Sequence, residues 1–260
     1  MRVLKSEKEL TNALTAVIRL DSLVMLHTIR ILLVIIFAAT TLRAQSAKEP
    51  VQPGETIIVS GGVSLWVWEK WKAQPHDNWW ANFVRAARIR IEQIKTARPD
   101  QPITWLVYRP SYVTRGRQDS RDYTALVASV RDAFNVKLMW FDSASQLVNY
   151  LNYGQPRDRV KINNFEYFGH SNKACFMFDY SNMIDSGSKC WLHESELKKI
   201  NSGLFTSDAL VRSWGCHTGE SMSQKWRSAT GAPMWGLSGK SQYLTEELPV
   251  PATAMGRWTR

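Results

Sequence analysis

The sequence lacks several patterns that would assign it to a well-marked class of protein. No segment is of low complexity and no repeat recurs at a fixed period, which argues against a solenoid or a propeller. Lysine and arginine give a net charge of +10, yet they form no uninterrupted basic tract of the kind found in nucleic-acid-binding arms. We therefore interpret the charge as a mostly solvated surface and expect no nucleic-acid partner.

The sequence also lacks an apolar run of transmembrane length. Its longest apolar stretch, ILLVIIFAATTL at 31–42, falls short of the ~20 residues that a membrane-spanning helix needs. His27 and Arg30 precede this stretch and a polar segment follows it, which is the layout of a secretory signal. We predict an N-terminal extension and signal peptide over 1–44, with Met25 as the natural start and cleavage after Ala44. The protein is then exported to the periplasm or the extracellular space of a bacterium. The alternative is an uncleaved anchor, which is the only membrane contact we expect.

Cysteine and histidine are scarce, with three and five residues. In an oxidising compartment Cys175 and Cys190 could form a disulfide, which would leave Cys216 as the odd, reactive thiol. The alternative is that all three cysteines are reduced and buried. His193 has no second ligand at a convincing spacing, so we predict no metal site and no cofactor.

Apolar strand-like runs alternate with segments of helical period after a linker at 45–54. This alternation predicts a single α/β domain over 55–260, built on a mostly parallel central sheet of about six strands. The expected strands are 56–60, 103–108, 136–141, 163–168, 209–214 and 234–237.

Helical periods fill the crossovers between these strands. One stripe runs from Trp80 to Ile94, and a second runs from Tyr123 to Phe134 after a cap at Asp119 and Ser120. A shorter helix is expected after Ser143. Two more are expected near the site, one ending at Gly203 and one at Gly231.

Two strand ends carry nucleophile chemistry. If strands 163–168 and 209–214 are parallel neighbours, His170 and Cys216 lie together beyond their carboxyl ends, where open α/β sheets build their sites. His170 would take the thiol proton and Cys216 would attack a carbonyl carbon. A helix after Cys216 would favour the thiolate through its dipole.

The loops around these two residues supply the remaining parts of such a site. The expected oxyanion donors are the Cys216 amide and an amide near Gly169 and Ser171. Gly215 allows the tight turn before the cysteine.

The segments YFGHSN and WGCHTG resemble the His-loop and Cys-loop of metacaspases and other caspase-like cysteine peptidases. The order of elements over about 101–240 is similar as well, including the loop RPSYVTRGRQDS after the second strand. The resemblance implies a three-layer caspase-like sandwich that hydrolyses a peptide or protein substrate, with His170 as base and Cys216 as nucleophile.

This sequence departs from the family pattern at two positions. Ser171 stands where the family has glycine after the histidine, and Trp214 stands where metacaspases carry an aspartate that helps to bind a basic residue. Trp214 and Asp179 are candidates for the substrate pocket. Together with Asp185, Asp179 is also a candidate for a Ca²⁺ site of the kind that acidic residues form in some metacaspases, although solvated loop carboxylates are the default interpretation.

Two other functions compete with the cysteine peptidase. GHSNK resembles the nucleophile elbow of α/β-hydrolases, which would make Ser171 the nucleophile, but Lys173 stands where the elbow requires glycine. The other alternative is a catalytically inactive caspase-like binding protein. Its ligand platform would be the tryptophan-rich stretch from Trp66 to Trp80, which is more often core packing.

Overall fold

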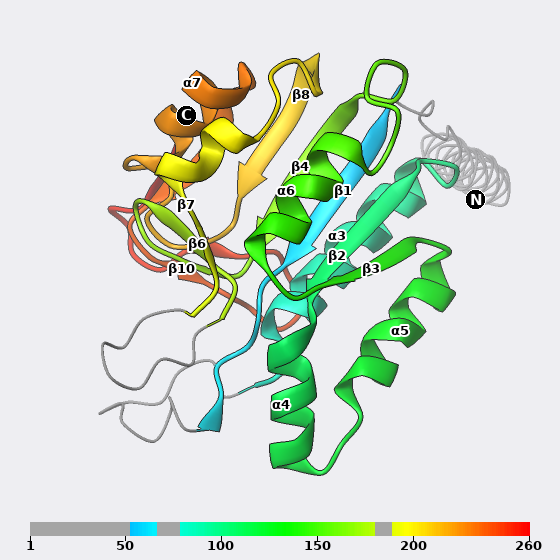
Figure 1. Cartoon of the computed structure of the whole chain (residues 1–260). Helices are drawn as coiled ribbons and strands as arrows, with labels where there is room; N and C mark the ends of the chain where they lie inside the picture. The colour runs from blue at the N-terminus through cyan, green and yellow to red at the C-terminus, as the bar shows by residue number, and fades with distance from the viewer. Residues whose placement is uncertain (1–52, 67–78, 180–188) are drawn as a thin grey trace, which may run out of the picture. The chain divides into compact units, whose positions relative to one another are not determined.

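The computed structural model describes residues 53–66, 79–179 and 189–260 (Figure 1). The predicted signal peptide with Met25 and Ala44, and all but the end of the linker, lie outside these ranges. Within the described ranges no helix is long and apolar enough to span a membrane.

A seven-stranded sheet forms the centre of the described structure, with strand order β12-β9-β8-β4-β1-β2-β3. Neighbouring strands are parallel, except that β12 runs antiparallel to β9. The predicted mixed α/β class with a mostly parallel sheet is therefore confirmed. All six expected strands are present, and β12 is the additional one. The strands are β1 (Glu55–Ser60), β2 (Ile103–Tyr108), β3 (Lys137–Phe141), β4 (Ile162–Phe168), β8 (Phe205–Ser213), β9 (Met234–Ser238) and β12 (Arg257–Thr259).

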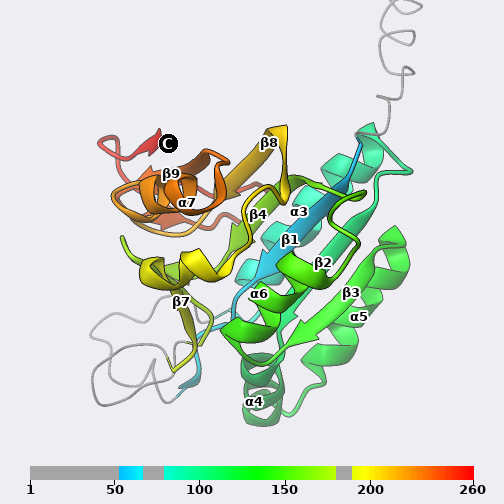
Figure 2. The ribbon, with the colours of Figure 1, turned by 45° about the horizontal axis from the view of Figure 1, so that its top comes forward.

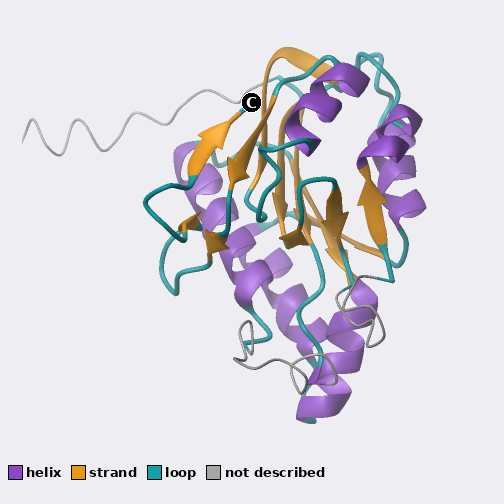
Figure 3. Ribbon diagram, turned by 90° about the vertical axis from the view of Figure 1, so that its left-hand side faces the viewer, coloured by secondary structure: helices purple, strands orange, loops and turns teal. Residues whose placement is uncertain are grey.

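Helices cover both faces of this sheet (Figures 1 and 2). On one face α3 (Asn82–Ala97) and α5 (Tyr123–Phe134) share a core with Ile58 and Trp105. On the other face α6 (Ala144–Tyr153) and α7 (Met222–Thr230) share a core with Ile57 and Leu106. Viewed along the edge in Figure 3, helices lie on both sides of the strands. Every residue of β1, β2 and β4 is buried between the two layers, as expected for central parallel strands.

Local sequence signals account for several of these helices. The apolar stripe of α3, including Phe83, Val84 and Ile91, is buried as predicted. Ser143 caps α6 by accepting a hydrogen bond from the backbone N–H of Gln146, which confirms the expected start. α7 ends at Gly231, which adopts the left-handed conformation at φ +80°.

The segment after β2 was expected to be a loop, and this expectation is wrong. It forms helix α4 (Arg109–Asp119), with Pro110 in its first turn. Its composition is polar, so no apolar stripe indicated a helix. Instead, α4 is held by tertiary contacts, because Tyr112 is fully buried and donates a hydrogen bond to the Gly61 carbonyl oxygen at 3.0 Å. The cap of α5 is correspondingly Asp122 rather than Asp119 and Ser120.

Two small antiparallel sheets lie beside the central one. The first contains β5 (His170–Ser171), β6 (Cys175–Met177) and β7 (Trp191–His193), and the second contains β10 (Ser241–Gln242) and β11 (Val250–Pro251). β7 leads into a 3-10 helix, η1 (Glu194–Lys199). The helix expected to end at Gly203 is therefore shorter and ends at Lys199.

The register of β6 and β7 separates the two cysteines that could have formed a disulfide. Cys175 pairs with His193, and Phe176 pairs with Leu192, so Cys190 lies beyond Met177 and opposite Phe178. Three strand positions correspond to roughly 10 Å, which exceeds the usual Cα separation in a disulfide. Cys175, Cys190 and Cys216 are all free thiols in the structure.

Candidate functional site

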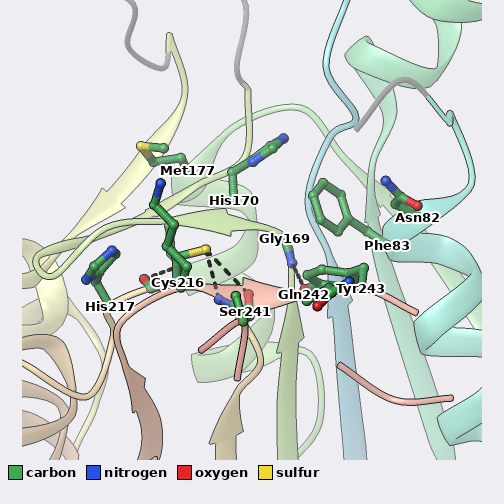
Figure 4. Close-up of a pocket in the computed structure, with 13 residues that line it drawn as sticks. Asn82, Phe83, Gly169, His170, Met177, Cys216, His217, Ser241, Gln242 and Tyr243 are labelled. Carbon is green, nitrogen blue, oxygen red and sulfur yellow. Dashed lines mark hydrogen bonds between the residues drawn. The ribbon is translucent and has the colours of Figure 1, made fainter. Parts of the chain in front are cut away.

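His170 and Cys216 line one cavity of about 500 Å³ (Figure 4). His170 follows β4 and Cys216 follows β8, and these two strands are adjacent and parallel, with Tyr167 opposite Ser213. The carboxyl ends of the two strands therefore bring the imidazole and the thiol to the same edge of the sheet, as the sequence predicted.

Gly215 lets the two loops pack directly against each other. A Cβ atom at this position would collide with the Ser171 side chain and come within 3.0 Å of the Gly169 carbonyl oxygen. Ser171 uses this close approach, because its Oγ donates a hydrogen bond to the Cys216 carbonyl oxygen at 2.8 Å. Ser171 and Gly215 thus fix the cysteine loop against the histidine loop, and the close approach that requires glycine is to the protein itself rather than to a substrate.

Ser241 holds the sulfur of Cys216. The Ser241 backbone N–H donates to Cys216 Sγ at 3.4 Å, and the Ser241 hydroxyl lies 3.4 Å from the same sulfur. Both contacts come from the first residue of β10, far from the histidine loop in sequence. An N–H donor at a cysteine sulfur stabilises the thiolate more than the neutral thiol, because a hydrogen bond to a charged acceptor is stronger.

The imidazole of His170 is held by groups other than Cys216. Its Nε2 lies 3.3 Å from Ser64 Oγ, and its ring meets the edge of the Phe83 ring at 4.8 Å between centroids. Arg115 of α4 in turn donates to the Ser64 carbonyl oxygen at 2.9 Å. Figure 4 shows the imidazole pointing away from the sulfur, so a Cys–His dyad requires this side chain to rotate.

The expected oxyanion loop differs from its predicted form. The backbone N–H of Gly169 donates to the Tyr243 hydroxyl at 3.0 Å and is therefore not free to bind an oxyanion. The backbone N–H of Cys216 makes no hydrogen bond within the described residues. The Cys216 amide thus remains the better-placed candidate donor to a developing negative charge.

The helix predicted after Cys216 is α7, which begins six residues beyond the cysteine, at Met222. A turn spans the interval, and the first amides of α7 are already occupied: Met222 donates to the Lys173 carbonyl oxygen and Ser223 to that of Thr218. These two amides are thus not available to the Cys216 sulfur. The N–H donor to the sulfur, which was expected from the start of this helix, comes from Ser241 instead.

His217 and Glu220 form a second polar pair at the same cavity. His217 lines the cavity, has a left-handed backbone at φ +61°, and lies with Nδ1 2.5 Å from Glu220 Oε1. The hydrogen bond from His217 lowers the pKa of Glu220. Glu220 also accepts the backbone N–H of Gly239 at 3.1 Å, which ties the cysteine loop to the segment that leads to Ser241.

The two residues proposed for the substrate pocket do not line this cavity. Trp214 is buried and stacks on Phe168 at 5.6 Å, while its indole N–H donates to Glu166 at 2.8 Å, so it belongs to the core. Asp179 accepts a hydrogen bond from the Tyr108 hydroxyl at 3.3 Å. Burial, and next the charge of Asp179, raise the pKa of Tyr108 well above its ordinary value.

The remaining candidates from the sequence do not line this cavity or lie outside the described residues. Asp185 lies outside the described residues, as do Trp68 and Trp71 of the tryptophan-rich stretch. Trp80 stacks on Tyr123 at 4.0 Å between ring centroids. His193 caps η1. Among the described residues no group of three or more histidine, cysteine or acidic side chains could hold a metal ion.

Sequence reasoning missed most of the cavity wall. Phe83, Ser241 and Tyr243 line the cavity, and Ser64 contacts His170 beside it; these residues come from three distant segments. None of them lies in a recognisable motif. Only their common position near the carboxyl edge of the sheet could have suggested them.

Comparisons with known proteins give no relative from which a function could be transferred. No family model matches the chain, and no curated protein or solved structure matches it significantly. The functional argument therefore depends on the site itself.

Proposed function

We propose that this protein is an exported cysteine peptidase with a caspase-like three-layer sandwich, which hydrolyses a peptide or protein through Cys216 and His170. The observation that carries the proposal is that these residues follow adjacent parallel strands, β8 and β4, and line one cavity of about 500 Å³. Helices on both faces of the sheet are consistent with such a sandwich. Export to the periplasm or the extracellular space is inferred from 25–44 of the sequence alone.

In the proposed reaction His170 removes the proton from the Cys216 thiol. The sulfur then attacks the carbonyl carbon of the scissile peptide bond, the C–N bond breaks, and the imidazolium returns its proton to the leaving amine. Water, activated by the same imidazole, hydrolyses the thioester, which releases a carboxylic acid and restores the thiol. The balance needs only water as co-reactant.

The surrounding contacts suit this chemistry. The Ser241 N–H stabilises the thiolate, the Cys216 N–H faces the developing oxyanion, and Ser171 fixes the loop that carries both groups. His170 leaves Ser64 and turns toward the sulfur when a substrate enters, since catalytic hydrogen bonds often tighten only in the substrate complex. Ser64 and Phe83 define the resting position of the imidazole.

A caspase-like binding protein without catalysis is the second candidate. The resting direction of the His170 imidazole, toward Ser64 rather than Cys216, favours it. A serine hydrolase that uses Ser171 has less support. An elbow needs a helix after the nucleophile, whereas Ser171 ends β5 and the chain turns back into β6.

The deciding experiment measures the rate at which iodoacetamide alkylates each cysteine of the full chain, resolved by mass spectrometry from pH 5 to 9. We expect Cys216 to react fast below neutral pH and to slow at least about tenfold in His170→Ala. His217→Ala is the matched control, because its imidazole lines the same cavity but pairs with Glu220.

Further measurements distinguish the cysteine peptidase, the serine hydrolase and the binding protein. Hydrolysis of a peptide library should be lost in Cys216→Ala and retained in Ser171→Ala at a reduced rate. A Cys216 that titrates as an ordinary thiol near ~8.5 and is indifferent to His170→Ala would rule out the dyad and leave the binding protein.

A further inference from the structure

The described part of the cavity wall is basic. Thirteen described residues line it, and they include Lys240, His170 and His217 but no aspartate or glutamate. The carboxylate of Glu220, next to this wall, is already engaged by His217 and by the Gly239 amide. An anion that enters the cavity therefore meets cationic or neutral groups among the described residues.

The backbone around Lys240 is fixed on both sides. The Gly239 carbonyl oxygen accepts the His217 N–H at 2.7 Å, and the Lys240 carbonyl oxygen accepts the Ala252 N–H at 2.9 Å. Lys240 is also the direct neighbour of Ser241, whose N–H contacts Cys216 Sγ at 3.4 Å. The lysine is thus held one residue from the group that positions the sulfur.

The charge of Lys240 is uncompensated within the described residues. Lys240 is exposed, and no ion pair or hydrogen bond of its ammonium group is present there. A lysine ammonium offers three donors and a point charge on a flexible stem, which suits a carboxylate that enters from solvent. The cavity wall also contains an aromatic pair, Phe83 and Tyr243, in edge-to-face contact at 4.9 Å.

From this arrangement we infer that the Cys216 cavity takes an acyl donor that carries a carboxylate, which Lys240 binds while Phe83 and Tyr243 pack against its apolar part. The inference rests on the proposed function, because it specifies the substrate class of that reaction. The carboxylate has two possible sources, an acidic side chain beside the scissile bond or a free terminal carboxylate. Both present the same chemistry to Lys240.

The test compares charged thiol reagents of similar size on the full chain. Cys216 is labelled with the anionic 2-sulfonatoethyl and the cationic 2-trimethylammonioethyl methanethiosulfonates, and the rates are resolved by mass spectrometry. Each rate is divided by the rate of the same reagent with a free thiol. We expect the anionic reagent to have the higher normalised rate, and the anionic-to-cationic ratio to fall about fivefold in Lys240→Gln. The advantage should shrink as salt is raised. Lys225→Gln, on α7 and outside the cavity wall, is the matched control and should leave the ratio unchanged.

A protection experiment distinguishes the two carboxylate sources. N-acetylaspartate amide presents only a side-chain carboxylate, N-acetylalanine presents only a terminal one, and N-acetylalanine amide presents neither. Slower alkylation of Cys216 by iodoacetamide in the presence of one carboxylate compound, lost in Lys240→Gln, identifies the source and supports the inference. Equal protection by the neutral amide, or no response of the rate ratio to Lys240→Gln, overturns it.

These readouts do not require peptide hydrolysis. If Cys216 is indifferent to His170→Ala but the charge ratio responds to Lys240→Gln, the peptidase proposal fails while the anion preference stands. If the dyad is present but the ratio does not change, the enzyme remains and the carboxylate preference is wrong.

Discussion

The three cysteines of this protein occupy three different environments at the residue scale. Burial raises the pKa of the Cys175 thiol to about 11, with further contributions from Glu194 and Glu196. Burial also raises the pKa of Cys190. The sulfur of Cys216 accepts the N–H of Ser241, and Cys216 is the one of the three that shares its cavity with His170. Residue type alone could not have ranked these thiols, since their neighbours determine which one can react.

The first prediction concerns Cys175. With a pKa near 11, its thiolate fraction at pH 8.5 is about two orders of magnitude below that of an ordinary thiol, so its alkylation should still be rising at pH 10. Glu194→Gln removes one of the negative charges that raise this pKa, and should move the profile to lower pH. Glu92→Gln, an exposed residue on α3, is the control and should leave it in place. Site-resolved alkylation against pH checks both variants, and a Cys175 midpoint near ~8.5 would contradict the assignment.

At the scale of elements, two helix ends are determined by a single capping residue that is recognisable in the sequence. Ser143 begins α6 and Gly231 ends α7, both as the sequence indicated. The polar helix α4 followed tertiary packing instead, through buried Tyr112 and Arg115. Its contribution to the site is indirect, since Arg115 binds the segment that carries Ser64, and Ser64 contacts His170.

The second prediction concerns the end of α7. A Cβ atom at Gly231 would have no neighbour within 4 Å, so the substitution Gly231→Ala tests backbone strain without a steric clash. At φ +80° we expect the free energy of unfolding to fall by about 1 kcal/mol. Gly231→Asn should lose less, because asparagine tolerates the left-handed region better. Urea denaturation measures both, and an unchanged Gly231→Ala variant would show that this helix end relaxes.

On the scale of the whole molecule, a buried ion pair joins the central sheet to one helical layer. Glu55 begins β1 and lies 2.7 Å from Arg157, which follows α6, and the two side chains are only 2% and 6% exposed. Tyr150 and Thr104 also donate to the Glu55 carboxylate, at 2.6 and 2.5 Å. The network connects three segments, β1, β2 and the stretch from α6 to Arg157, so its loss should destabilise the whole fold.

The third prediction follows from this network. Glu55→Gln leaves the Arg157 guanidinium buried without its counter-charge, and we expect the free energy of unfolding to fall by about 3 kcal/mol. The exposed pair of Arg131 and Asp132 provides the control, since breaking it with Asp132→Asn should change stability little. Thermal and urea unfolding of both variants compare them directly. A Glu55→Gln protein as stable as the parent would mean that the buried pair only just offsets its own desolvation.

The sequence by itself determined the parts of this protein that depend on periodicity and on local caps. Apolar runs predicted all six expected strands, and the order of strands and helices placed His170 and Cys216 at one edge of a parallel sheet. The sequence did not predict strand order or register, because both arise from pairing between distant segments. Register separated Cys175 from Cys190, and packing between loops brought Ser241 to the sulfur, turned His170 toward Ser64 and put Trp214 in the core. Only the tertiary structure decided these features, because each depends on contacts between residues that no local pattern connects.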